Sequence, residues 1–102
     1  MGLALTGKKL PAAQAAEWGM IWEAVEDAAF ATSVDTLAAK LATMPTKALV
    51  RTRQAMQLAH THNFEEHLTY EGTLMRELGK SADYVEGVSA FLEKRAPKFT
   101  GE

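Results

Sequence analysis

An aromatic ring and a cation stand three residues apart near the end of the chain, at Phe91 and Lys94. Side chains at this spacing share one face of a helix, and cations are stabilised at a helix C-terminus because the terminal carbonyl groups are negative. With Arg95 and Lys98 close by, the pair suits a purine that bears phosphates. The alternative, which spacing alone favours, is a core phenylalanine followed by a lysine that merely complements the last helical turn.

Histidines and acids cluster in the second half of the chain, where Glu65 and Glu66 lie among His60, His62 and His67. Imidazole and carboxylate groups bind zinc when they converge. Here the first two histidines straddle a predicted helix end, the pair five apart lies on diverging helix faces, and the sequence has no His-Glu-x-x-His motif. We therefore expect a solvated helix junction and no metal site.

Glu71 lies on the apolar side of a predicted helix, where a carboxylate is costly unless it is paired. Local spacing places no histidine, serine or second carboxylate beside it. We expect a structural carboxylate that meets Arg51, Arg76 or a backbone amide, with a catalytic acid or base as the alternative. For Trp18 and Trp22 we expect core packing, with a ligand platform as the alternative. No complete set of catalytic residues is found.

Apolar residues recur at spacings of three and four along most of the chain, a pattern typical of amphipathic helices. Helix boundaries are indicated by the capping pair Asn63 and Glu66, by Ser81, and by glycine and proline. The apolar start of the chain, up to Leu5, has no N-cap and looks as though the chain enters in the middle of a helix. The predicted helices that follow are Pro11 to about Glu17 closed by Trp18-Gly19, a helix capped by Asp27 that ends before Met44-Pro45, about Thr46 to Ala59, a helix between Asn63 and Gly79, and a last helix between Ser81 and Pro97.

The predicted fold class is all-α, with four or five helices whose neighbours run roughly antiparallel. Met20–Val25 is the only strand candidate, because it is apolar and partly aromatic or β-branched. The stripes expected to face inward are Phe64, Leu68, Met75 and Leu78 on the helix that follows Asn63, and Tyr84, Val88, Phe91 and Leu92 on the last helix.

Length and charge restrict the classes of function. The chain of 102 residues is long enough for one small domain, and 11 basic against 13 acidic residues give a net charge of −2. No global positive field is present for nucleic acid or an anionic membrane, so neither partner is expected. The sequence contains no cysteine and no apolar run as long as a membrane span, and we expect a cytoplasmic protein.

Several stretches, which together span nearly the whole chain, resemble a known protein family. These stretches are Leu5-Thr6-Gly7, Ala12–Ala15 with Trp18–Ile21, Glu71, and above all Asp83-Tyr84-Val85-Glu86-Gly87-Val88-Ser89-Ala90-Phe91-Leu92-Glu93-Lys94-Arg95. In these stretches the chain resembles the C-terminal portion of the crotonase superfamily, the enoyl-CoA hydratase/isomerase family. Within that family, Glu17–Trp22, the stretch from Ser81 to Arg95, and Phe99-Thr100-Gly101 most resemble the epoxyphenylacetyl-CoA isomerases of phenylacetate breakdown.

The resemblance implies a parent fold of repeated ββα units followed by a helical region that helps to build trimers, often paired into hexamers. Residues 1–102 would be that C-terminal helical region, with the N-terminal catalytic core absent and no activity of its own. It also implies that the oxyanion hole and the acid/base carboxylates precede this sequence, so no catalytic residue is assigned here. No covalently bound cofactor is expected.

For the ligand, the resemblance implies a coenzyme A thioester as substrate. It places Phe91 and Lys94 at the positions that contact the adenine and 3′-phosphate region of CoA, usually in an adjacent subunit. The alternative from another class of protein is a stand-alone helical module whose apolar stripes bind a protein partner.

Overall fold

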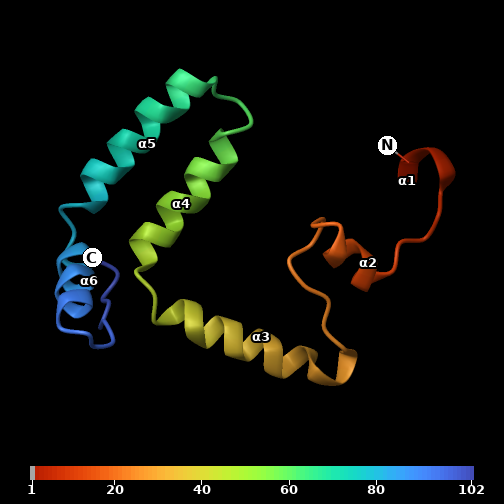
Figure 1. The fold of residues 1–102 in the computed structure, drawn as a ribbon, viewed down its shortest axis with the longest axis horizontal. Helices are drawn as coiled ribbons and strands as arrows, with labels where there is room; N and C mark the ends of the chain where they lie inside the picture. The colour runs from red at the N-terminus through yellow and green to blue at the C-terminus, as the bar shows by residue number, and fades with distance from the viewer. Residues whose placement is uncertain (1) are drawn as a thin grey trace. The chain divides into compact units, whose positions relative to one another are not determined.

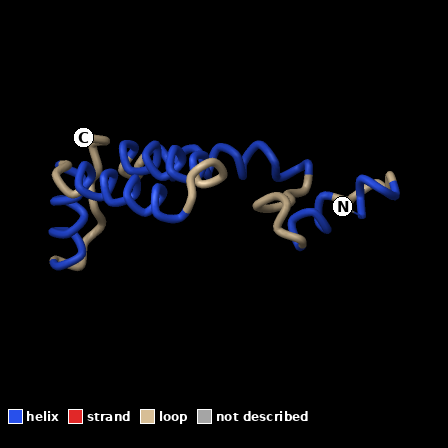
Figure 2. The backbone as a smooth tube through the Cα atoms, turned by 90° about the horizontal axis from the view of Figure 1, so that it is seen from above, coloured by secondary structure: helices blue, strands red, loops and turns tan. Residues whose placement is uncertain are grey.

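The computed structural model describes residues 2–102, and within them every regular element is a helix (Figures 1 and 2). The predicted all-α class is confirmed, with one helix more than the largest number expected. The helices are α1 (Gly2–Thr6), α2 (Ala12–Glu17), α3 (Asp27–Ala42), α4 (Thr46–Leu58), α5 (Phe64–Leu78) and α6 (Ala82–Leu92).

The chain divides into two compact units, Met1–Thr36 and Leu37–Glu102, and α3 runs from one into the other. In the first unit, α2 ends as predicted at Trp18-Gly19. Gly19 adopts a φ of 71°, a left-handed conformation that glycine reaches without steric cost. The amide of Met20 then donates to Ala15 O at 2.9 Å, which closes the helix end.

The predicted strand Met20–Val25 is wrong, because this segment consists of bends and irregular backbone. A strand needs a neighbour to pair with its backbone groups, and residues 2–102 contain no second strand. Core packing of the two tryptophans is also wrong. Trp18 is 55% exposed and Trp22 is 79% exposed.

In the second unit, α3 is followed by a helical hairpin in which α4 and α5 lie side by side and antiparallel (Figures 1 and 2). The turn between them ends in the predicted capping box. Asn63 Oδ1 accepts from the Glu66 amide, Glu66 Oε2 accepts from the Asn63 amide, and both distances are 3.0 Å. These bonds satisfy two amides that a helix start would otherwise leave unpaired.

At the end of the hairpin away from its turn, charged side chains join α4 to α5. Arg51 of α4 donates to Glu77 Oε1 of α5 through Nη2 at 2.8 Å, and Lys47 Nζ lies 3.4 Å from the same oxygen. The hydrogen bond from Arg51 is the main cause that lowers the pKa of Glu77 from its ordinary value of 4.5. The partner of Arg51 is thus Glu77 and not Glu71, for which Arg51 was one of three predicted partners.

Little apolar surface is buried within the described residues. Of the stripe predicted to face inward on α5, Phe64 is 83% exposed and Met75 is 73% exposed, whereas the buried residue of α5 is Leu74. The stripe predicted on α6 is exposed too, and that helix buries Asp83 and Ala90 instead. The inward faces were therefore assigned wrongly, since the side that α6 turns toward the rest of its unit is offset by about one residue.

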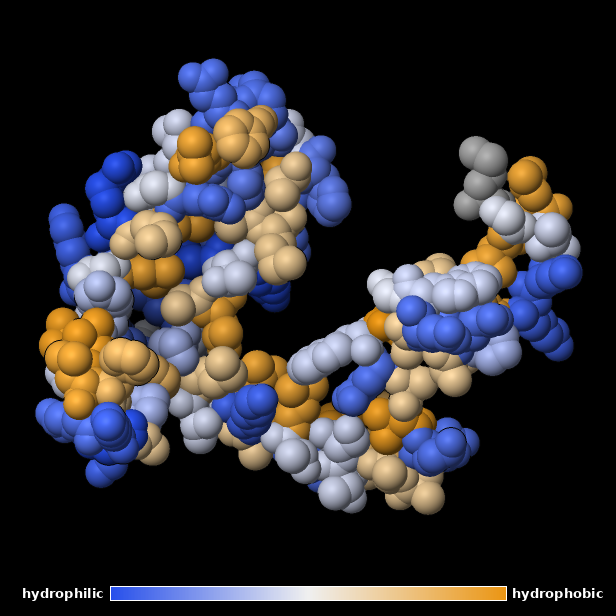
Figure 3. All heavy atoms as spheres, in the orientation of Figure 1, coloured by the Kyte–Doolittle hydropathy of each residue, from blue (hydrophilic) through white to orange (hydrophobic). Residues whose placement is uncertain are grey.

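Apolar atoms remain visible on the surface over α6 at the lower left of Figure 3. Such exposed patches are typical of surfaces that another protein element covers. None of the helices in residues 2–102 combines the length and the apolar character that a membrane crossing requires.

Candidate functional site

The candidate site lies at the C-terminal end of α6, and both ends of this helix are capped. At its start, Ser81 Oγ accepts from the Tyr84 amide at 3.1 Å, as predicted. At its end, the Lys94 amide donates to Phe91 O at 3.3 Å and the Arg95 amide donates to Ala90 O at 3.0 Å. This pair of bonds is the Schellman pattern that terminates a helix.

Lys94 therefore lies outside the helix, in the turn that ends it. Its φ is 54°, and within the described chain Lys94 is the one residue other than glycine with a left-handed backbone conformation. This conformation costs a residue with a side chain on the order of 1 kcal/mol, and glycine is the usual occupant of the position. The prediction that Lys94 shares a helix face with Phe91 in the last turn is wrong, because α6 ends at Leu92.

Phe91 is open to solvent, with 82% of its surface exposed, so the alternative of a core phenylalanine does not hold within this chain. Lys94 is also exposed. Its ammonium forms no ion pair within residues 2–102. The ring and the cation at the end of α6 are both accessible, although the turn and not the helix carries the cation.

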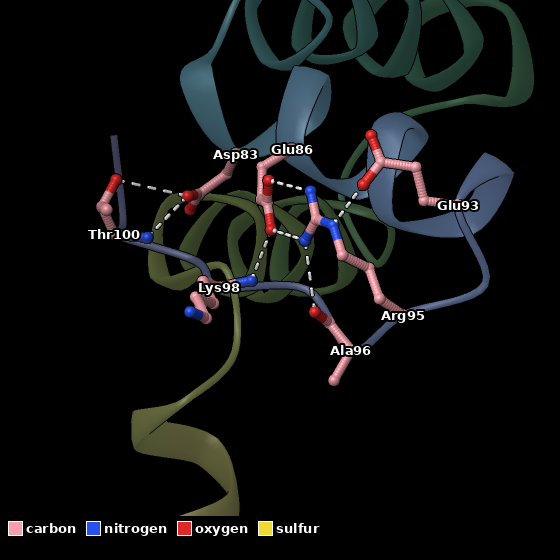
Figure 4. Close-up of polar contacts among 7 residues, drawn as sticks. All are labelled: Asp83, Glu86, Glu93, Arg95, Ala96, Lys98 and Thr100. Carbon is pink, nitrogen blue, oxygen red and sulfur yellow. Dashed lines mark hydrogen bonds and ion pairs between the residues drawn. The ribbon is translucent and has the colours of Figure 1, made fainter.

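Arg95 is the centre of a polar cluster beside this turn (Figure 4). Its Nη1 and Nη2 atoms contact the two carboxylate oxygens of Glu86 at 2.6 and 2.9 Å, and its Nε atom contacts Glu93 Oε2 at 2.6 Å. Two parallel bonds to one carboxylate make a strong and directional pair. Arg95, which the sequence suggested as a helper of Lys94, is thus already engaged by two acids.

The pKa of Glu86 is lowered from 4.5 to about 2, chiefly by the hydrogen bonds from Arg95 and then by the backbone amide of Lys98, which donates at 2.7 Å. The hydrogen bonds to Glu86 and then to Glu93 raise the pKa of Arg95 above its ordinary value. Both groups are charged throughout the neutral range.

The depressed pKa predicts how the cluster responds to acid. A carboxylate whose pKa is lowered by folding stabilises the folded state above its unfolded pKa, and this contribution disappears as the pH falls through the folded value. We expect the cluster to be intact above pH 4.5 and to open as the pH falls toward about 2. Carboxyl carbon chemical shifts of Glu86, followed from pH 6 downward by NMR, check this, and a midpoint near 4.5 would contradict it.

Asp83 fixes the C-terminal tail, residues 96–102, along α6 (Figure 4). Its carboxylate accepts from the backbone amides of Thr100 at 2.7 Å and Gly101 at 2.9 Å, and its own amide donates to Glu102 O at 3.0 Å. Asp83 is only 5% exposed. The anchored tail returns past the helix that carries Phe91.

The tail also packs against α6 through an aromatic ring. Phe99 packs over Gly87 of α6, since a Cβ at that position would lie 3.5 Å from Phe99 Cε1, an ordinary van der Waals distance. Asp83, Glu86 and Arg95 were not predicted as members of this arrangement. The spacing of nine residues between Glu86 and Arg95 bridges a helix end, which helical periodicity does not describe.

At the histidine junction, residues 2–102 contain no group of three or more side chains arranged to hold a metal ion. His62 and His67, however, do not diverge, because their Nδ1 atoms lie 3.5 Å apart and their ring centres 5.6 Å apart. His62 precedes α5 and is not on it, so helical geometry does not separate the pair.

Glu71 pairs with neither arginine. Its Oε1 atom lies 3.3 Å from His67 Nε2, one helical turn earlier, and its side chain is 54% exposed. The prediction of a costly carboxylate on an apolar face that pairs with Arg51 or Arg76 is therefore wrong. The signal for the actual partner was the spacing of four residues to His67, which the sequence reasoning overlooked.

Comparison with known proteins places the chain in a family. The sequence profile described as enoyl-CoA hydratase/isomerase matches residues 1–102. The chain belongs to the enoyl-CoA hydratase/isomerase family, as its resemblance implied.

The relatives are longer than this chain. It is 51% identical to 1,2-epoxyphenylacetyl-CoA isomerase of Escherichia coli over 102 residues, which are 100% of this chain and 39% of that protein. It is 33% identical to (E)-benzylidenesuccinyl-CoA hydratase of Thauera aromatica over 99% of this chain and 40% of that protein.

A solved structure of the family likewise matches this chain over only part of its own length. The structure of an enoyl-CoA hydratase from Mycobacterium marinum superposes with a TM-score of 0.85 at 29% identity, over 100% of this chain and 42% of that one. The chain thus spans about two fifths of the length of the relatives that it matches.

Proposed function

We propose that this chain is the C-terminal helical region of an acyl-CoA isomerase or hydratase that resembles epoxyphenylacetyl-CoA isomerase. In this proposal it supplies subunit contacts and part of the CoA site, and it has no activity alone. The catalytic core of ββα units, with the oxyanion hole and the acid/base carboxylates, belongs to a longer enzyme in the part that precedes this sequence. The match over 39% of the E. coli isomerase supports this division.

The observation that carries the proposal is that the ring of Phe91 and the cation of Lys94, three residues apart at the end of α6, are both accessible. A ring that is 82% exposed can stack on adenine, and an ammonium without a carboxylate partner can meet the 3′-phosphate of CoA. Each contact is worth on the order of 1 kcal/mol at a partly exposed site. Neither residue takes part in the chemical step.

Subunit contacts are the second part of the proposal. Large apolar side chains are exposed on α5 and α6, among them Phe64 at 83% and Leu92 at 74%. An open apolar groove of about 360 Å³ lies between α4, α5, α6 and the tail, with Ala48, Met75, Tyr84 and Phe99 in its lining. The catalytic core and sister subunits of a trimer or hexamer would cover such surfaces in a cytoplasmic enzyme.

The test is expression of the complete reading frame that contains these residues. We expect a longer polypeptide that forms trimers or hexamers and turns over acyl-CoA thioesters, whereas residues 1–102 expressed alone turn over none. The epoxyphenylacetyl-CoA and enoyl-CoA thioesters are the first substrates to compare. A reading frame confined to these residues would contradict the proposal and favour the stand-alone helical module.

A further inference from the structure

Lys94 occupies a costly backbone conformation, and the contacts around it explain how it is held. The residue before it, Glu93, and the residue after it, Arg95, are joined directly by the 2.6 Å contact between Glu93 Oε2 and Arg95 Nε. The two Schellman bonds fix the backbone on both sides of the turn. A left-handed residue with a side chain persists only where its surroundings determine it this closely.

The same guanidinium ties the turn to the helix. Arg95 binds both oxygens of Glu86, a residue nine positions earlier in α6, and Glu86 also accepts from the Lys98 amide at 2.7 Å. Arg95, Glu86 and Glu93 therefore form one unit, which we call the Arg95 clamp. The turn that carries Lys94 cannot swing away from α6 without breaking a bidentate ion pair.

The clamp also affects the electrostatics of Lys94. Glu93 directly precedes Lys94, and in the polar cluster of Figure 4 both Glu93 and Glu86 direct carboxylate oxygens at Arg95. Without the guanidinium of Arg95, these two carboxylates would lie beside the Lys94 turn with no cation paired to them. An ammonium is available to an external phosphate only when neighbouring acids are satisfied elsewhere.

We infer that Arg95 is a positioning residue for the phosphate-binding lysine: its clamp on Glu86 and Glu93 holds Lys94 in the left-handed turn and keeps the ammonium available to the nucleotide 3′-phosphate. This inference rests on the proposed function, since it names the residue that makes the Lys94 contact possible. In this role Arg95 acts through Lys94 and does not itself contact the nucleotide.

The test is a double-mutant cycle in the full-length enzyme, with KM and kcat measured for an acyl-CoA thioester. We expect Lys94→Ala to raise KM about fivefold and Arg95→Met to raise it about threefold to fivefold, both with kcat nearly unchanged. In Lys94→Ala/Arg95→Met the KM should equal that of Lys94→Ala alone, because the clamp acts only through Lys94. Arg95→Lys, which keeps the charge but not the bidentate geometry, should fall between wild type and Arg95→Met.

Other outcomes separate the two claims. If the effects of Lys94→Ala and Arg95→Met on KM multiply, or if Arg95→Met leaves KM unchanged, the positioning role is overturned while the CoA contact of Lys94 stands. If Lys94→Ala itself leaves KM unchanged, the proposed function fails and the inference fails with it. Lys80→Ala, which removes an exposed lysine from the turn after α5, is the matched control and should leave both constants unchanged.

Arg95→Met could instead prevent the enzyme from folding. In that case Glu93→Gln serves as the second variant, since it removes the negative charge beside Arg95 Nε and leaves the bidentate pair with Glu86 in place. It should raise KM less than Arg95→Met, again with no added effect in the Lys94→Ala background. A KM increase in that background overturns the inference.

Discussion

Asp83→Ala should lower the free energy of unfolding by about 2–4 kcal/mol, the largest stability effect that we expect from a single substitution in α6. The buried carboxylate accepts two backbone amides of the tail, at 2.7 and 2.9 Å. Hydrogen bonds to a charged group contribute more than neutral ones, and their loss leaves tail amides without a partner. Urea unfolding followed by circular dichroism measures the change.

Two further variants define the cause of that loss. Asp83→Asn keeps an acceptor oxygen but not the charge, so its cost should be intermediate. Asp35→Ala removes an exposed acid from α3 and should change stability by no more than about 0.5 kcal/mol. The anchoring role of Asp83 would be refuted by equal stabilities of Asp83→Ala and Asp35→Ala.

The second large effect concerns ligand affinity. In the full-length enzyme, Phe91→Ala/Lys94→Ala should raise KM for acyl-CoA thioesters by tenfold or more, since two contacts of on the order of 1 kcal/mol each are removed. The constant kcat should change little, because these contacts are remote from the reacting carbon and are the same in the ground and transition states. Steady-state kinetics over a range of thioester concentrations gives both constants.

The control for this variant is a pair with matched chemistry elsewhere in the chain. Phe30→Ala/Lys80→Ala removes one exposed ring of α3 and one exposed lysine, neither of which the proposal places at the CoA site or names among the subunit contacts. An equal rise of KM in the control and in the test variant would show that the effect comes from general loss of packing.

Local signals in the sequence predicted most helix boundaries. Asn63 with Glu66 marked the start of α5, Ser81 marked the start of α6, and Gly19 marked the end of α2. Each of these signals acts through hydrogen bonds between residues close in sequence, so no tertiary information is needed.

The predicted inward faces were wrong because they depend on tertiary contacts, which local sequence signals do not describe. Helical periodicity locates an apolar stripe but not what covers it, and the stripe of α6 that contains Phe91 is exposed in this chain. Met20–Val25 was read as a strand from composition alone, although strand formation depends on a partner elsewhere in the fold.

Residue types indicated Phe91 and Lys94 as candidate site residues, and their contact with CoA stays a prediction. The helix-face argument for them was wrong, because α6 ends at Leu92 and Lys94 lies in the Schellman turn that follows. The Arg95 clamp was missed, since it joins residues across a helix end. A lysine at the position that glycine usually occupies was the available signal.

The central claim is that Lys94 binds the 3′-phosphate of CoA, and the most direct measurement compares CoA with 3′-dephospho-CoA. Dissociation constants for both ligands are determined by isothermal titration calorimetry on the full-length enzyme and on its Lys94→Ala variant. The wild type should bind CoA about fivefold more tightly than 3′-dephospho-CoA, and Lys94→Ala should bind the two equally. The same preference for CoA in both proteins would contradict the assignment of Lys94.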